Sequence, residues 1–366
     1  MLRNFRSAGL APVLVVPRVT KPLPASVSVL ESLPFPFSKL PWQIAGARGI
    51  KRLNRLFEQQ IALADPATTA AYFWPGSPPA LIKRAKEAGI LTIGQMINTF
   101  QGTAKKILDR SYGRLALPSG CTISQRDIDF EICELSLYDF VFAPNPEVER
   151  SLHEAGVEAQ RIISTSFGWS PSRYAKSNGI QDSQRPLRFL FVGTAGVRKG
   201  VPTLLQAWKN ARIAGELVIV GHVEAAIQDW MTAAMQDSSV RHVAFTEDVG
   251  AFYRCADIFV FPTIEEGGPQ VTLEAGGCGL PVITTPMGAA RLVEHDVNGL
   301  IVQTENVDAL TEAMVRMAGN ADLRAKFSQR IERDAARFTY DEVSASHART
   351  IVGLLQARMP NDPGGV

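Results

Sequence analysis

Two acids, Glu266 and Glu274, are separated by seven residues that include a glycine-containing turn. The turn, formed by Gly267, Gly268 and Pro269, follows the buried-strand pattern "ADIFVFPT" and precedes a helix predicted over residues 270–278. Free backbone N–H groups at such a helix start attract anions. Acids beside an anion site are suited to another task, which is accepting hydrogen bonds from hydroxyl groups such as those of a sugar or a ribose.

A second segment whose residues could bind a ligand is "FLFVGTAGVRKG", which covers residues 189–200. A predicted buried strand leads to Gly193, a turn of small residues follows, and Arg198 and Lys199 come just before Gly200 and a predicted helix. Small residues let the backbone approach a phosphate closely, and two cations can neutralise its charge. The pattern is neither G-x-G-x-x-G nor a Walker A loop. Taken alone, a strand followed by a solvated Arg-Lys pair explains it more simply.

The elements that must position these segments alternate between strand and helix, which predicts an α/β fold with parallel sheets. A polar stretch at residues 181–186 is the predicted domain boundary. Ligands of such sheets lie at the carboxyl ends of strands, and two facing domains would hold theirs in the cleft between them. The sequence predicts strands at 12–17, 70–74, 91–98, 140–144, 187–193, 216–221, 240–245, 256–263 and 281–285, a proline-rich stretch at 17–41, and helices at 49–65, 80–90, 125–139, 145–157, 201–211, 225–235, 249–256, 270–278 and 337–355.

The composition is that of an ordinary globular protein, and 366 residues suffice for two domains. A net charge of +2 indicates no nucleic acid partner for the whole chain. Four scattered cysteines without a C-x-x-C pair argue against a zinc site or a disulfide framework and favour a reducing cytoplasm. No apolar run reaches the roughly 18 residues that would span a bilayer, and no signal peptide is recognisable.

The first sixty residues are strongly basic, with nine Lys or Arg residues against two acids. Phe35, Phe37, Leu40 and Trp42 lie among them. This combination permits peripheral contact with an anionic membrane, on its inner face, that carries a lipid acceptor. A solvated basic face with ordinary core aromatic residues is the alternative, and it is favoured slightly.

Joined in order, the segment at residues 189–200, "LVIVGH", "VGAFYRCADIFVFPT", "EEGGPQVTLEAGGCGLPVIT" and "NGLIV" resemble the C-terminal half of GT-B glycosyltransferases of the GT4 type, the glycosyl transferases group 1. The resemblance is dense over residues 187–340 and thin before them. It implies two Rossmann-like, doubly wound parallel-sheet domains facing across a cleft. Residues 1–180 would form the acceptor-side domain, 181–340 the nucleotide-sugar-binding domain, and 341–366 a terminal helix crossing back to the first domain, with a short tail.

The same resemblance implies an enzyme that moves a sugar, with retention of configuration, from a nucleotide-diphosphate sugar to the hydroxyl of an unidentified acceptor, without cofactor or metal. Lys199 would contact the donor diphosphate, Glu266 the hydroxyls of the transferred sugar and Glu274 the ribose. Two alternatives stay open, a GT-B nucleotide-sugar epimerase and a non-catalytic relative that binds sugar nucleotides. The residues implied for donor binding are Gly193, Thr194, Gly267, Gly268, Pro269, Gln270, Val271 and Glu274.

Several positions depart from the family pattern. Thr194 occupies the place of an arginine, and Arg198 is predicted to supply the missing cation as a catalytic residue with Lys199 and Glu266. The Gly-Gly-Pro turn replaces the sequence "EGFG" of many members. Two further glycines, at 276 and 277, each cost a helix about 0.8–1 kcal/mol relative to alanine, so we expect a tight packing contact there.

The N-terminal part gives less information. It resembles the end of the family's first helix followed by its second strand, so the first strand and its glycine-rich loop are expected to be absent. Asn98, Thr99 and Gln101 are candidates for the acceptor side, as is "FWPGSPP" at residues 73–79, although a plain loop is equally plausible for each. Gly168 is a hinge candidate. The D-x-D pattern at residues 127–129 lies in a predicted helix and is interpreted as a solvated face.

Overall fold

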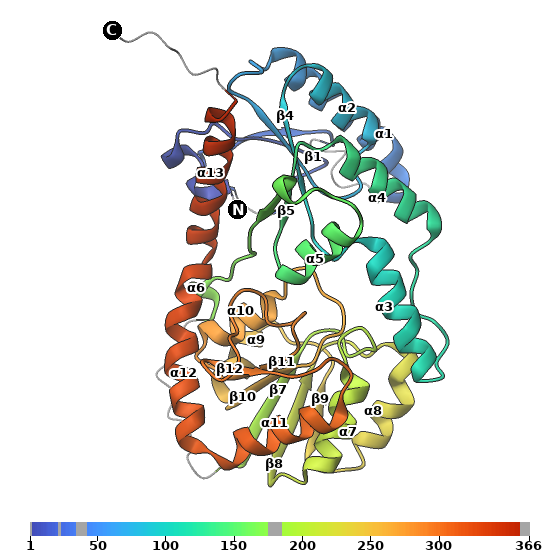
Figure 1. Cartoon of the computed structure of the whole chain (residues 1–366), viewed down its shortest axis with the longest axis vertical. Helices are drawn as coiled ribbons and strands as arrows, with labels where there is room; N and C mark the ends of the chain where they lie inside the picture. The colour runs from blue at the N-terminus through green and yellow to red at the C-terminus, as the bar shows by residue number, and fades with distance from the viewer. Residues whose placement is uncertain (1, 21–22, 34–41, 175–184, 359–366) are drawn as a thin grey trace.

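The computed structural model describes residues 2–20, 23–33, 42–174 and 185–358. Within these residues the strands form a two-stranded, a four-stranded and a six-stranded sheet, and all strand pairs are parallel. Figure 1 shows the four-stranded sheet and the six-stranded sheet one above the other, with helices around each. The predicted α/β class is therefore confirmed.

The six-stranded sheet has the order β12-β11-β10-β7-β8-β9. Its central strands β7 and β10 each contain four consecutive apolar residues that are buried on both faces, as expected for a parallel sheet covered by helices. All predicted strands of this part are present. The elements are β7 (Leu187–Val192), α7 (Val201–Ala211), β8 (Gly215–Val220), α8 (Gln228–Ala234), β9 (Val240–Val243), α9 (Val249–Cys255), β10 (Ile258–Phe261), α10 (Gln270–Gly277), β11 (Val282–Thr284), β12 (Gly299–Ile301), α11 (Val307–Gly319) and α12 (Ala321–Ala335).

The four-stranded sheet has the order β3-β4-β5-β6 and carries an apolar core on each face. One core contains residues of α2, α4 and α5, and the other packs the sheet against the C-terminal helix and the first residues of the chain. The elements are α1 (Trp42–Leu63), β3 (Ala70–Phe73), α2 (Pro79–Glu87), β4 (Leu91–Gln95), α3 (Gln101–Arg114), α4 (Gln125–Leu137), β5 (Phe140–Ala143), α5 (Pro146–Glu154) and β6 (Ile162–Ser164).

The beginning of the chain differs in part from the sequence prediction. The predicted strand at residues 12–17 is present as β1 (Val13–Val16), and it pairs with β2 (Ser28–Glu31). No strand was predicted at β2, because prolines surround this short run and obscure its alternation. Two short 3-10 helices, Leu2–Asn4 and Arg6–Ala8, precede β1 where the end of an α-helix was expected.

The terminal helix α13 (Tyr340–Gln356) returns from the six-stranded sheet to the four-stranded sheet (Figure 1). Its buried side chains pack against Leu91, Ile93 and Phe142 of the four-stranded sheet. The two chain segments that connect the sheets run side by side, because the Trp169 amide donates to Phe338 O and the Tyr340 amide donates to Trp169 O. Gly168 lies at this point, and a side chain there would lie 2.9 Å from the Tyr340 Cα.

None of the helices in the described part of the chain combines the length and the apolar character needed to cross a bilayer.

Candidate functional site

The direction of strand order in the six-stranded sheet reverses between β7 and β10. The chain proceeds outward from β7 through β8 to β9 and then returns to β10 and proceeds the other way. The loops that follow β7 and β10 therefore diverge at the same edge of the sheet, which is where ligands bind in open α/β sheets. Lys199 lies in the first of these loops and Glu266 in the second. Strand order thus brings together two residues that are 67 positions apart.

Lys199 and Glu266 form an ion pair between Nζ and Oε2. Their side chains are only 17% and 14% exposed, so solvent screens the pair weakly. The ammonium group also lies 5.8 Å from the centre of the Phe261 ring at the end of β10. The site therefore holds one cation and one carboxylate side by side, and each can bind a different part of a ligand that has both anionic and hydroxyl groups.

The loop after β7 depends on glycine at both ends. Gly193 and Gly200 adopt positive φ values of 141° and 70°. A Cβ at Gly200 would lie 1.9 Å from the Pro262 carbonyl oxygen, so the two loops pack directly against each other. Thr194 is exposed, and the Val197 amide donates to Glu224 Oε2 over 3.0 Å.

Arg198 contacts both halves of the molecule. Its Nε lies 2.6 Å from Glu265 Oε2, and its Nη2 donates to Asn98 Oδ1 over 2.8 Å. Thr99 donates from its hydroxyl to the other oxygen of Glu265. The polar groups of Asn98 and Thr99 are therefore bound by residues of the C-terminal half. Glu265 was assigned no role from the sequence, although the Glu265-Glu266 doublet marks it.

Gln101, the third acceptor-side candidate, is the first residue of α3 and donates its backbone N–H to Glu131 Oε2 over 2.6 Å. Glu131 lies on α4 and is almost fully buried. Burial raises the pKa of Glu131 to about 7, and the nearby charges of Glu134 and Glu265 act in the same direction against the amide hydrogen bond. No motif in the sequence had marked Glu131 as a site residue.

The glycines of the turn after β10 face protein groups. A Cβ at Gly267 would lie 1.8 Å from the Ile97 carbonyl oxygen, and one at Gly268 would lie 2.0 Å from the Phe167 ring. These positions require glycine because the N-terminal half approaches them, whereas the family resemblance had implied both glycines for donor binding. Helix α10 begins after Pro269, as predicted. The Gln270 side chain donates to the Tyr340 hydroxyl over 2.8 Å, and Val271 is half-buried.

Glu274 lies one turn into α10 and accepts two tyrosine hydroxyls. Tyr174 donates to Oε1 over 2.6 Å and Tyr253 donates to Oε2 over 3.0 Å. Burial raises the pKa of Glu274, and the two hydrogen bonds partly oppose this. An ionised carboxylate has about four acceptor positions, so two tyrosines leave capacity for further hydroxyls. The tyrosine partners could not be predicted, since they lie 100 and 21 residues away.

The expected packing contacts at Gly276 and Gly277 are present. A Cβ at Gly276 would lie 2.6 Å from Leu292 Cδ2, and one at Gly277 would lie 2.3 Å from Trp169 Cζ2. Close approach of these side chains therefore explains why α10 contains two poor helix formers.

The D-x-D pattern lies on an exposed stretch of α4, as predicted. Asp127 and Ser124 form a capping box at the start of the helix, and Asp129 accepts from the Gln125 side chain. Nowhere in the described ranges do three or more His, Cys, Asp or Glu side chains form a group that could hold a metal ion.

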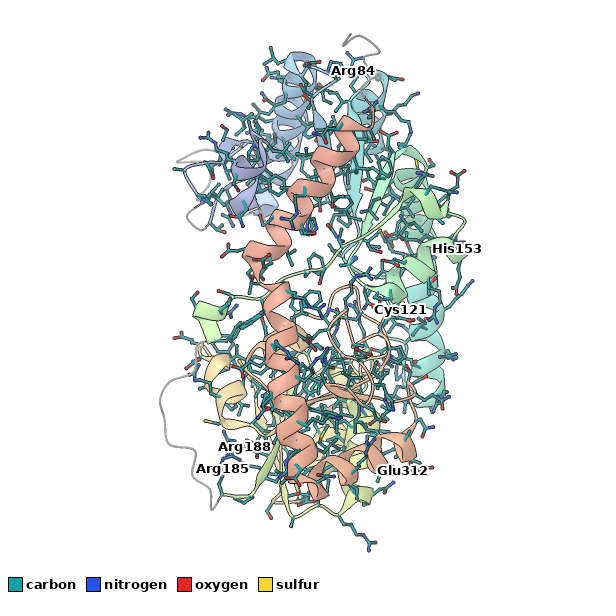
Figure 2. The ribbon with its side chains drawn as sticks, turned by 60° about the vertical axis from the view of Figure 1, so that its left-hand side comes forward. Arg84, Cys121, His153, Arg185, Arg188 and Glu312 are labelled. Atoms are coloured by element: carbon teal, nitrogen blue, oxygen red, sulfur yellow. The ribbon has the colours of Figure 1, made fainter. Side chains whose placement is uncertain are left out.

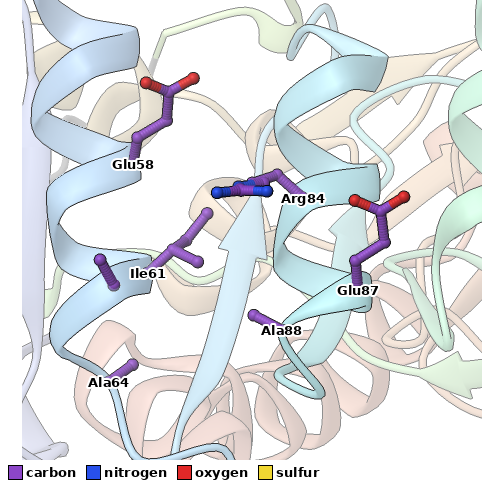
Figure 3. Close-up of a pocket in the computed structure, with 7 residues that line it drawn as sticks. Glu58, Ile61, Ala64, Arg84, Glu87 and Ala88 are labelled. Atoms are coloured by element: carbon purple, nitrogen blue, oxygen red, sulfur yellow. The ribbon is translucent and has the colours of Figure 1, made fainter.

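A cavity of about 590 Å³ lies between α1 and α2, away from the loops described above (Figure 3). Arg84, Glu58 and Glu87 line it together with Ile61 and three alanines. In Figure 2 Arg84 lies at the top of the molecule, whereas Arg185 and Arg188, at the start of the six-stranded sheet, lie near the bottom. Lys199 and Glu266 are not among the residues that line this cavity.

The basic region near the N-terminus is partly described. Phe35, Phe37 and Leu40 lie outside the described residues, as does the side chain of Trp42. Four basic side chains of α1 are exposed and recur at the spacing of one helical face. They are Arg48, Lys51, Arg52 and Arg55.

Comparisons with known proteins find similarity over parts of the chain. Residues 186–320 match the model of the family "Glycosyl transferases group 1". An uncharacterized glycosyltransferase of Haemophilus influenzae is 26% identical over 195 residues, which are 50% of this chain and 53% of that protein. A D-inositol 3-phosphate glycosyltransferase of Salinispora arenicola is 32% identical over 111 residues, which are 30% of this chain and 23% of that protein. The chain spans about half the length, or less, of the curated relatives it matches.

Solved structures show the similarity of fold along the chain. Sucrose-phosphate synthase from Thermosynechococcus elongatus has a TM-score of 0.73 at 16% identity, with 97% of this chain and 92% of that chain covered. HepE of Anabaena, solved in complex with UDP and glucose, has a TM-score of 0.65 at 16% identity, with 89% and 86% covered. The fold is therefore GT-B, as predicted.

Proposed function

We propose that this chain, whose residues 186–320 form a domain of the glycosyl transferases group 1 within a GT-B fold, transfers a sugar from a nucleoside diphosphate sugar to an acceptor hydroxyl. The observation that carries the proposal is the Lys199–Glu266 ion pair at the edge where the strand order reverses. Residues 1–180 would bind the acceptor and 181–340 the donor, and residues 341–366 would contain the helix that returns to the first part.

In the proposed complex, Lys199 leaves Glu266 and binds the diphosphate, while Glu266 accepts hydrogen bonds from the sugar hydroxyls. Glu274, one turn into α10, would use its remaining acceptor capacity on the ribose. Gly193 and Thr194 would lie beside the diphosphate. The backbone from Gly267 to Val271 would offer N–H groups at the start of α10.

Negative charge accumulates on the diphosphate as its bond to the sugar breaks. A cation and backbone amides already in position stabilise this charge more in the transition state than in the bound donor, which lowers the barrier. Lys199 is the proposed cation, because Arg198 is held both by the buried Glu265 and by Asn98 of the N-terminal half. We propose that the leaving phosphate accepts the proton of the acceptor hydroxyl and that the sugar keeps its configuration, without a metal or cofactor.

UDP-sugars are the first donors to test, since HepE, with the same fold, was solved with UDP and glucose. The acceptor is proposed to be a glycan, a lipid-linked glycan or a small hydroxyl compound. One relative, CapM of Staphylococcus aureus, carries the name of a capsular polysaccharide biosynthesis glycosyltransferase. This relative favours a role in polysaccharide biosynthesis.

The experiment is a thermal-shift screen with UDP-, GDP- and ADP-sugars, followed by product analysis with and without candidate acceptors. If the protein is a transferase, the nucleotide sugar that stabilises it in the screen should lose its sugar to an acceptor. An altered nucleotide sugar formed without any acceptor would identify an epimerase instead. Stabilisation without turnover across all acceptors would identify a binding protein and refute catalysis.

We also propose peripheral contact with the inner face of an anionic membrane through the exposed basic face of α1. Sedimentation with vesicles containing phosphatidylserine would test this, because electrostatic binding should be strong at low salt and lost at high salt. A protein that stays in the supernatant at every salt concentration would exclude the contact.

A further inference from the structure

Glu265 is a buried acid directly beside Glu266, and both oxygens of its carboxylate have partners. Its side chain is 1% exposed. Oε1 accepts from the Thr99 hydroxyl over 2.7 Å and from the Thr99 amide over 3.2 Å, while Oε2 lies 2.6 Å from Arg198 Nε. One carboxylate thus joins the segment after β4 in the N-terminal half to the loop after β7 in the C-terminal half.

Arg198 and Gly267 extend the same contact. Arg198 Nη2 donates to Asn98 Oδ1 over 2.8 Å, next to the residue that Glu265 binds. The backbone at Gly267 packs so closely on Ile97 that no side chain fits between them. Three consecutive residues of the N-terminal half, from Ile97 to Thr99, therefore touch three residues of the C-terminal half.

The other side of this segment is held within the N-terminal half. Glu131 Oε2 accepts from the Gln101 amide over 2.6 Å, at the first turn of α3. Residues 97–101 are therefore bound by one buried acid from each half, Glu131 and Glu265. A shift of one half against the other must break the contact with Glu265 or the contact with Glu131.

The C-terminal partners of this segment are sequence neighbours of the proposed chemical groups. Arg198 precedes Lys199, and Glu265 precedes Glu266. The backbone of Arg198 is also bonded to the second loop, since its carbonyl accepts from the Ile264 amide over 3.0 Å. Displacement of the segment at residues 97–101 would therefore move the backbone that sets the positions of Lys199 and Glu266.

We propose that Glu265 is a positioning residue that couples the approach of the two halves to the alignment of Lys199 and Glu266. The inference rests on the proposed transfer function and adds a residue that touches no substrate. Donor binding needs only the C-terminal loops, whereas turnover needs both halves in register. Loss of the Glu265 charge should therefore lower kcat and leave the KM for the donor nearly unchanged.

The test compares Glu265→Gln with Glu216→Gln. Glutamine keeps the size of Glu265 and an oxygen for Thr99 but loses the charge that holds Arg198. Glu216 is a matched control, because it forms an ion pair with Arg188 in the same sheet, at its opposite end. The probes are UDP binding by calorimetry, turnover of the donor found in the thermal-shift screen, and hydrogen exchange of the peptide that covers residues 97–101.

We expect Glu265→Gln to raise exchange in residues 97–101 at least tenfold and to lower kcat at least tenfold, with the UDP Kd and the donor KM within threefold of wild type. Glu216→Gln should match wild type throughout. Unchanged exchange in this peptide, or a fall in kcat that parallels loss of UDP binding, would overturn the inference. A wild-type protein without turnover would instead refute the transfer function, while the exchange result would still decide whether Glu265 holds the segment.

Discussion

Replacement of Gly267 by alanine is the most direct perturbation of the contact between the two halves. The new Cβ would lie 1.8 Å from the Ile97 carbonyl oxygen and 2.5 Å from the Asn98 nitrogen, where contacts under 3.0 Å essentially never occur. These obstacles are main-chain atoms, which cannot rotate away as a side chain can. The N-terminal segment must retreat by about 1 Å, and a misplacement of that size can cost about 10²-fold in rate.

The backbone at Gly267 is not in the left-handed region, so alanine adds a clash without a conformational penalty. We therefore expect kcat to fall about 100-fold, which corresponds to about 2.7 kcal/mol of barrier. The assay is release of the nucleoside diphosphate from the donor selected by thermal shift, at saturating acceptor.

Gly113→Ala is the matched control, since a Cβ at that position of α3 meets no atom within 4 Å. It should have wild-type kcat and the same thermal midpoint or a slightly higher one, because alanine favours a helix. A Gly267→Ala protein with wild-type kcat would show that the contact seen between Ile97 and Gly267 is not part of the working arrangement. The reasoning about closure would then be refuted.

Three further predictions follow from the same geometry. Lys199→Ala and Glu266→Ala should each lower kcat at least tenfold, about 1.4 kcal/mol of barrier, and wild-type rates in both would exclude this site. Gly277→Ala should lower the thermal midpoint, since overpacking against the adjacent indole costs about 1–3 kcal/mol and exceeds the helix gain of about 1 kcal/mol. Gly353→Ala, in α13 with open space around it, should raise the midpoint instead. Burial raises the pKa of Glu131 to about 7, so between about pH 4.5 and 7 the folded protein binds a proton that the unfolded chain has lost. The free energy of unfolding of the wild type should therefore fall by up to about 3 kcal/mol as pH rises through this range. Denaturant titrations should show that Glu131→Gln flattens this dependence.

The segments around Lys199 and Glu266 were predictable because each is a continuous strand, turn and helix. Each residue lies in the short turn between its strand and its helix, and local pattern alone places Lys199 before α7 and Glu266 before α10. Local pattern could not predict that Lys199 pairs with Glu266, because this pairing depends on β7 and β10 being neighbours in the sheet. That order comes from the topology of the sheet, and only the resemblance of the joined segments to a family indicated it.

In the described part of the chain, three long helices and the four-residue helix α6 (Pro171–Tyr174) were missed. Helix α3 begins after Phe100 without a side-chain cap and contains two glycines, so its sequence signal is weak. Contacts across the molecule support it instead, including the hydrogen bond from Tyr112 to Glu224. Helices α11 and α12 did carry a signal, because Asn306 and Asn320 each accept a backbone amide of the helix that they precede.

The adjacent acids Glu265 and Glu266 show where sequence information ends. They have the same chemistry and follow the same strand, yet Glu265 binds Thr99 of the N-terminal half and Glu266 binds Lys199. Of these two acids the family spacing identified Glu266 alone, and Glu265 acquires its partner Thr99 only when the two halves meet. Substitution of the two acids should therefore separate two effects. Loss of the Glu265 charge should loosen residues 97–101, whereas loss of the Glu266 charge should lower turnover while these residues stay protected from exchange.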